Sequence, residues 1–138
     1  MIQNYSNEIS LHESKAIELF SELGMQKNIA KTLLCISING GCRSVDIEQK
    51  TKQRQQEVSV ATQELMKKGW ITKLTFIKKN KIKPVQIYRL TCSINEIINK
   101  IEKEKTKEIE KIIKNLSTIK TLIKSYNYKI ILGRRGGE

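Results

Sequence analysis

The sequence contains little of the chemistry on which enzymes depend. It has one histidine, His12, and it lacks the GxxxxGKS/T phosphate loop, the HExxH metal pair and the GxSxG nucleophile turn. Its paired acidic residues lie in a late charged stretch, where they alternate with lysines as on a solvated helix. These absences argue against a catalytic site. We therefore predict a protein that is not an enzyme and uses no cofactor.

Cysteines and long apolar runs are also scarce. Cys35, Cys42 and Cys92 form no CxxC pair, which predicts neither a disulfide framework nor a zinc ribbon. We expect buried, unpaired thiols; redox sensing through Cys35 and Cys42 is the alternative, although only Arg43 is adjacent in sequence to lower a thiol pKa. No run approaches the roughly 18 apolar residues of a membrane span, and the N-terminus lacks a signal-peptide pattern. A cytoplasmic, nucleoid-associated protein is expected.

Positive charge is abundant, and most of it lies in one segment. The net charge is +12 from 26 Lys/Arg and 14 Asp/Glu. Residues 50–92 hold eleven basic and two acidic residues, whereas residues 1–49 carry −2 and residues 93–138 carry +5. A phosphate-binding surface requires such a concentration. A solvated, lysine-rich surface is the alternative, but composition alone would spread the excess evenly.

Two helices are predicted ahead of the basic segment. Ser10 and Glu13 match a capping box, and the apolar stripe that follows stops at Gly24, which predicts a helix over residues 11–23. A second periodic stretch covers residues 26–38 and ends at an Asn-Gly-Gly breaker. We expect the second of these helices to be nearly surrounded by apolar contacts.

Two shorter helices joined by a polar turn follow. Ser44 can cap the first, in which Val45 and Ile47 are expected to face inward. The second, over residues 55–68, places apolar side chains at helical spacing on one face. Its opposite face can contact base edges and phosphates in the major groove, which accommodates a helix. The side chains assigned to DNA in this recognition helix are Arg54, Gln55, Gln56, Ser59, Gln63 and Lys67.

A hairpin is predicted after the recognition helix. Gly69 suits the left-handed position that ends a helix, and residues 70–77 and 85–90 are rich in β-branched and aromatic residues. The intervening loop, residues 78–84, is positioned to reach sugar and phosphate. Its candidate DNA contacts are Lys78, Lys79, Lys81 and Lys83. A solubilising loop is the alternative.

One long helix should follow the hairpin. Neither glycine nor proline interrupts residues 93–126, and the apolar positions in the second half step by alternating threes and fours. That pattern is typical of a coiled-coil seam, so a homodimer is expected; packing on its own domain is the alternative. The predicted seam residues are Ile109, Ile112, Leu116, Ile119 and Ile123. Residues 127–138 are expected to form a basic flexible tail.

A family resemblance rests on four segments within residues 23–91: LGMQKNIAKTLL, DIEQKT, RQQEVSVATQEL leading to KKGWI, and YRLT. In these segments the chain resembles archaeal winged-helix transcription regulators of the broad TrmB and MarR-like type. The resemblance implies a dimeric, sequence-specific DNA-binding regulator, with the recognition helix on residues 54–68 and the wing on residues 78–84. No room remains after the winged helix for a large effector domain, so no small-molecule effector is expected.

The sequence therefore predicts a mainly α fold with a small β-hairpin. Residues 1–92 would form a winged helix-turn-helix domain, residues 93–126 a dimerisation helix, and residues 127–138 the tail. The predicted function is sequence-specific binding of double-stranded DNA by a dimeric transcriptional regulator, without membrane contact. The alternative is an architectural, weakly specific protein that coats DNA. A protein-interaction module would leave the basic surface unexplained.

Overall fold

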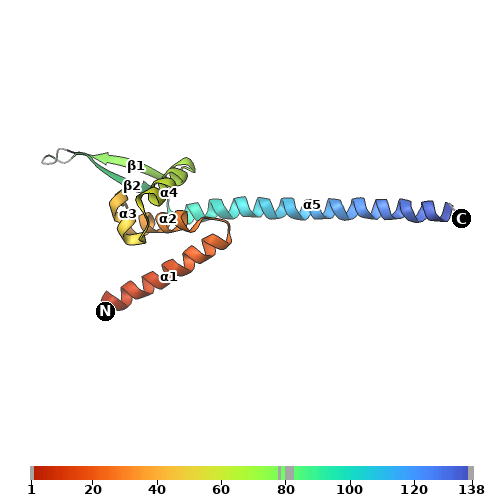
Figure 1. Cartoon of the computed structure of the whole chain (residues 1–138), viewed down its shortest axis with the longest axis horizontal. Helices are drawn as coiled ribbons and strands as arrows, with labels where there is room; N and C mark the ends of the chain where they lie inside the picture. Colours follow the sequence, from red (N-terminus) through yellow and green to blue (C-terminus); the bar gives the residue numbers. More distant parts are fainter. Residues whose placement is uncertain (1, 78, 80–82, 137–138) are drawn as a thin grey trace. The chain divides into compact units, whose positions relative to one another are not determined.

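The computed structural model describes the backbone of residues 2–77, 79 and 83–136, and within these the side chains from His12 to Ile130. They form two compact units, Met1–Ile94 and Asn95–Glu138. The predicted class is confirmed: a mainly α, winged helix-turn-helix fold with one antiparallel hairpin, followed by a long C-terminal helix. The elements are α1 (Ile2–Glu22), α2 (Lys27–Asn39), α3 (Ser44–Thr51), α4 (Gln55–Lys67), β1 (Ile71–Phe76), β2 (Val85–Leu90) and α5 (Ile94–Gly136) (Figure 1).

Helix α2 is the centre of the first unit. It contacts α1, α3, α4 and β2, because it presents apolar side chains on several faces. Leu33 and Ile36 of α2 are fully buried, as are Ile47 of α3 and Leu65 of α4. Each such side chain stabilises the fold by roughly 1.5–3 kcal/mol. The core therefore holds the two short helices, α3 and α4, in a fixed arrangement.

Two glycines end helices as their sequence positions suggest. Gly24 and Gly69 have φ angles of 97° and 77°, in the left-handed region where a side chain is disfavoured. After α4, the Gly69 N–H donates to Met66 O and the Trp70 N–H donates to Leu65 O, which forms a Schellman motif. Because Trp70 closes the helix, β1 begins at Ile71 and not at residue 70.

The first helix is longer than predicted. It begins at Ile2, so the Ser10–Glu13 pattern lies inside α1 and does not cap it. A Ser-x-x-Glu spacing is compatible with a helix interior as well as with a start, and no glycine or proline precedes it to stop the helix. The predicted start at residue 11 was therefore wrong, whereas the end at Gly24 is confirmed.

The start of α3 also differs from its prediction. Arg43, not Ser44, is the N-cap residue, and its N–H donates to Asp46 Oδ2 at 3.1 Å. Ile47 is fully buried, but Val45 is 52% exposed, so the expectation that both face inward was wrong. Residues two apart lie on nearly opposite sides of a helix, and only one of them can face the core.

The loop between α2 and α3 adds a short backbone bridge to the edge of the β1–β2 hairpin. The β1–β2 register runs from Ile71 opposite Leu90 to Phe76 opposite Val85. Cys42 adds a bridge to β2 through two backbone hydrogen bonds with Tyr88, of 2.8 and 2.9 Å. A Cβ on the preceding Gly41 would lie 3.1 Å from Ile87 Cγ2, so glycine permits this close approach.

The last helix extends well beyond its predicted end. α5 contains 43 residues and continues from Tyr126 through Gly136, so the predicted end of the long helix at residue 126 was wrong. A single interior glycine, Gly133, costs only about 1 kcal/mol in a helix and need not stop one. Ile97 and Ile101 are buried near its start, whereas the predicted seam side chains are all exposed.

Candidate nucleic-acid interface

The turn between α3 and α4 is anchored by a buried polar cluster. Lys52 adopts a left-handed conformation (φ 55°), and the next residue, Gln53, points into the protein. Gln53 Nε2 donates to Thr51 Oγ1 at 2.7 Å and to Thr32 Oγ1 of α2 at 3.2 Å. Both hydroxyls donate in turn to backbone carbonyls of their own helices. The cluster therefore ties the helix-turn-helix to the central helix.

Replacing Gln53 by alanine should lower the free energy of unfolding by about 1–2 kcal/mol. The change removes two buried hydrogen bonds and leaves a small cavity. The expected decrease is moderate because Oε1 of Gln53 has no hydrogen-bond partner among the described residues, so the wild-type cluster already tolerates one unsatisfied atom. Urea unfolding measures the difference, with Gln56→Ala on exposed α4 surface as the control. Equal midpoints for the two variants would contradict this role.

The predicted recognition face of α4 is exposed. Val58, Ala61, Thr62 and Leu65 are buried, so the apolar face was predicted correctly. The six side chains assigned to DNA are all exposed: Arg54, Gln55, Gln56, Ser59, Gln63 and Lys67. An exposed amide or hydroxyl can donate to or accept from a base edge without first breaking an internal hydrogen bond. The surface is therefore open to a nucleic acid.

Val60 is a candidate contact that the sequence reasoning missed. It lies among the polar residues of α4 and is 55% exposed. An apolar side chain on such a face can contact the methyl group of thymine. The sequence could have indicated this, because helical spacing places Val60, five residues after Gln55, away from the buried stripe.

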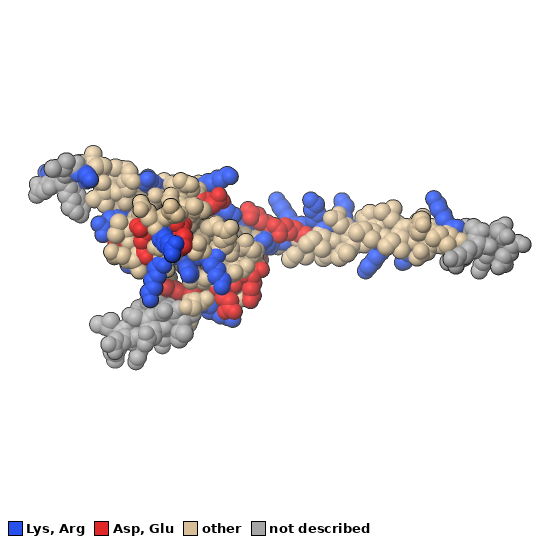
Figure 2. Space-filling model, in the orientation of Figure 1, with Lys and Arg blue, Asp and Glu red and all other residues tan. Residues whose placement is uncertain are grey.

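The predicted wing lies partly within the described residues. Lys79 and Lys83 are exposed, whereas Lys78 and Lys81 lie outside the described residues. Along the strands, Lys73 Nζ lies 5.6 Å from the centre of the Tyr88 ring. Figure 2 shows Lys and Arg side chains along the hairpin. The basic segment recognised in the sequence thus includes side chains that are free to reach phosphate.

Cys35 and Cys42 approach each other, which their spacing did not predict. Both are buried, and their Sγ atoms are 3.9 Å apart. Burial, with a smaller contribution from Cys42, raises the pKa of the Cys35 thiol to about 12. Burial also raises the pKa of Cys42. Thiolates are the reactive species, so the raised pKa values disfavour oxidation of this pair at neutral pH.

In the folded protein at pH 8, Cys35 should be alkylated on the order of a thousandfold more slowly than in the unfolded chain. The estimate compares the small thiolate fraction of a group with a pKa of about 12 with that of an ordinary cysteine. Mass spectrometry after timed iodoacetamide labelling, with and without urea, measures the ratio for each cysteine. Redox sensing would instead be supported by two results together. Cys35 would be labelled rapidly in the folded protein, and peroxide would lower the DNA affinity of the parent but not that of Cys42→Ser.

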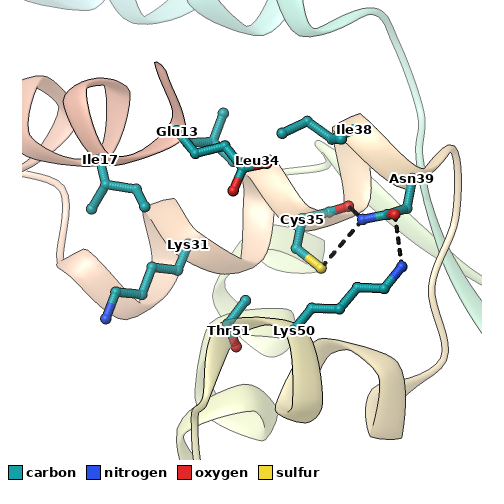
Figure 3. Close-up of a pocket in the computed structure, with 9 residues that line it drawn as sticks. All are labelled: Glu13, Ile17, Lys31, Leu34, Cys35, Ile38, Asn39, Lys50 and Thr51. Atoms are coloured by element: carbon teal, nitrogen blue, oxygen red, sulfur yellow. Dashed lines mark hydrogen bonds between the residues drawn. The ribbon is translucent and has the colours of Figure 1, made fainter. Parts of the chain in front are cut away.

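A hollow of about 330 Å³ lies where α1, α2 and α3 meet (Figure 3). Lys50 Nζ of α3 donates to Asn39 Oδ1 at 2.7 Å, and Asn39 Nδ2 donates to Cys35 O at 2.7 Å. The first bond joins the end of α2 to α3, and the second holds the Asn39 side chain against its own helix. The rest of the wall is formed by the apolar Ile17, Leu34 and Ile38 and by Glu13, Lys31 and Thr51.

Neither a metal centre nor a membrane span is found in the described part of the chain. In that part, no three or more His, Cys, Asp and Glu side chains are arranged so that they could hold a metal ion. Among the described helices none is sufficiently long and apolar to cross a bilayer.

Comparison with known proteins identifies the fold. No family model and no curated protein matches the sequence. A solved structure described as a possible transcriptional regulator from Methanosarcina mazei Go1 aligns with a TM-score of 0.56 at 16% identity, over 69% of this chain and 79% of that chain. A MarR family regulator from Neisseria meningitidis aligns with a TM-score of 0.44 at 13% identity, over 93% of this chain and 96% of that chain. The first alignment shows a shared fold.

Proposed function

We propose that this protein is a dimeric transcriptional regulator that binds double-stranded DNA in a sequence-specific manner. In this proposal α4 enters the major groove and the lysine-rich hairpin loop contacts the backbone. The observation that supports it most is that the positive charge and the helix-and-hairpin arrangement fall on the same residues. Residues 50–92 hold a net charge of +9, and the same residues form the α4 face and hairpin of a winged helix.

An architectural DNA-coating protein would need the same charge, so specificity decides between the two functions. Non-specific binding is almost wholly electrostatic, whereas base contacts add roughly 1–3 kcal/mol of discrimination each. The uncharged amides and hydroxyl on the exposed face of α4 favour base reading, because charge alone does not require them. Selection from random duplexes with the purified protein tests the proposal. An enriched inverted repeat supports a regulator, and the absence of enrichment supports the architectural alternative.

Replacing Gln55, Ser59 and Gln63 by alanine should reduce discrimination between sites more than overall affinity. These side chains are exposed on α4 and carry no charge, so their removal eliminates base contacts and leaves the electrostatic attraction intact. Affinities for the selected duplex and for a scrambled duplex should converge by roughly 1–3 kcal/mol for each bidentate base pairing that is removed. Asn99→Ala, on exposed α5, is the matched control. Equal decreases on both duplexes would assign the three residues to the backbone.

A further inference from the structure

The exposed face of α5 contains an ordered apolar row. With Ile109 at heptad position a, the alternating steps of three and four place Leu116 and Ile123 at a as well. The d positions are then Ile112, Ile119 and Tyr126. All six row members are 50–66% exposed: Ile109, Ile112, Leu116, Ile119, Ile123 and Tyr126. An unbroken row of this kind is typical of the seam of a coiled coil.

Charge is distributed very unevenly along the same helix. Residues 95–110 contain five glutamates and four lysines, whereas residues 111–136 contain seven Lys/Arg and no acidic residue. Figure 2 shows acidic side chains over the first part of α5, and only basic and uncharged ones beyond it. Two helices lying in the same direction would place these basic segments side by side along their whole length.

We propose that α5 pairs with α5 of a second copy of this chain in an antiparallel coiled coil. The inference deepens the proposed dimer and depends on it. In an antiparallel coil, position a packs against position d of the partner. One register fills every layer of the row: Ile109 against the partner's Tyr126, Ile112 against the partner's Ile123, and Leu116 against the partner's Ile119. Each layer occurs twice, by the twofold symmetry of a homodimer.

Residues flanking the seam favour this direction. Glu108 and Lys129, both exposed, occupy g positions, and in this register Glu108 faces the partner's Lys129 on each side of the dimer. In a parallel coil the same two residues would be 21 positions apart and could not meet. A parallel coil would also place Lys105, at a d position, against the partner's Lys105 inside the seam, which is unfavourable.

Charge exchange at the flanking pair tests the direction. Glu108→Lys and Lys129→Glu should each weaken dimerisation by roughly tenfold, because two opposite-charge pairs become like-charge pairs. The double variant should regain most of the parent affinity; the pair that Glu108 makes with Lys105 of its own helix at 3.3 Å stays broken. The effects should shrink in high salt. Glu110→Lys is the matched control, because it makes the same charge change at a b position, which faces away from the seam, and it should change dimerisation little. Single variants that are not rescued by the double would overturn the proposal.

Disulfide trapping gives an independent result. In an antiparallel coil, Ile109→Cys and Tyr126→Cys proteins should cross-link when mixed and oxidised mildly, and neither should cross-link through the new cysteine alone. The parent protein, which carries the three native cysteines, is the control, and mass spectrometry identifies the linked peptides. A dimer in which each variant links to its own copy would be parallel, which overturns this inference and leaves the proposed dimer intact. A monomer in sedimentation at all concentrations overturns both.

Discussion

Replacing Leu116 and Ile119 by aspartate is expected to convert the protein into a monomer that remains folded. In the single chain these side chains are 52% and 50% exposed, and neither supports the core of the first unit. A dimer would bury four such side chains, each worth roughly 1.5–3 kcal/mol, and buried charge would add a further penalty. Dimerisation should therefore become undetectable at micromolar concentration. Sedimentation measures the mass, and circular dichroism measures the helix content.

The same variant should bind a two-half-site operator far more weakly than the parent and a single half-site about equally. Ser117→Asp with Thr118→Asp is the matched control, because it adds the same charges at positions b and c, which face away from the seam. The control should remain dimeric. If the seam variant stayed dimeric as well, the subunits would meet through another surface. The next candidate would be α1, because its Leu19 and the adjacent Leu23 are exposed.

Neutralising Lys79, Lys81 and Lys83 by glutamine should weaken binding to every duplex by a similar factor. Lysines in a wing contact phosphate, which has no sequence information. Removing one lysine–phosphate interaction should flatten the dependence of log affinity on log salt by about 0.9, and removing all three should flatten it by about 2.7. Fluorescence anisotropy across a salt series, on a selected and a scrambled duplex, measures both quantities.

Removing the same number of positive charges from another surface shows whether the wing lysines contact DNA directly or only add to the overall attraction between protein and DNA. Lys103, Lys107 and Lys111 of α5 are exposed and lie outside the apolar row, so their replacement by glutamine removes the same charge. This control should retain most of the salt dependence. A wing variant with an unchanged slope would show that the loop is only a solvated surface.

Local patterns in the sequence determined most of the helices and strands and the exposed face of α4 in the candidate site. Helical spacing identified Val58 and Leu65 as buried and left the polar face of α4 exposed. The run of β-branched and aromatic residues predicted the observed limits of β2, Val85–Leu90, and Gly69 marked the end of α4. Such features depend on neighbouring residues within one or two turns, so periodicity and capping rules describe them well.

Only the tertiary structure decided which distant side chains meet. Gln53 looks like an ordinary turn residue, yet it joins Thr32 of α2, 21 positions away. The approach of Cys35 to Cys42 depends on the Gly40–Gly41 turn and on the bridge to β2, not on their spacing alone. These contacts arise when helices pack, and packing depends on the shape and volume of the whole core, which no single stretch of sequence contains.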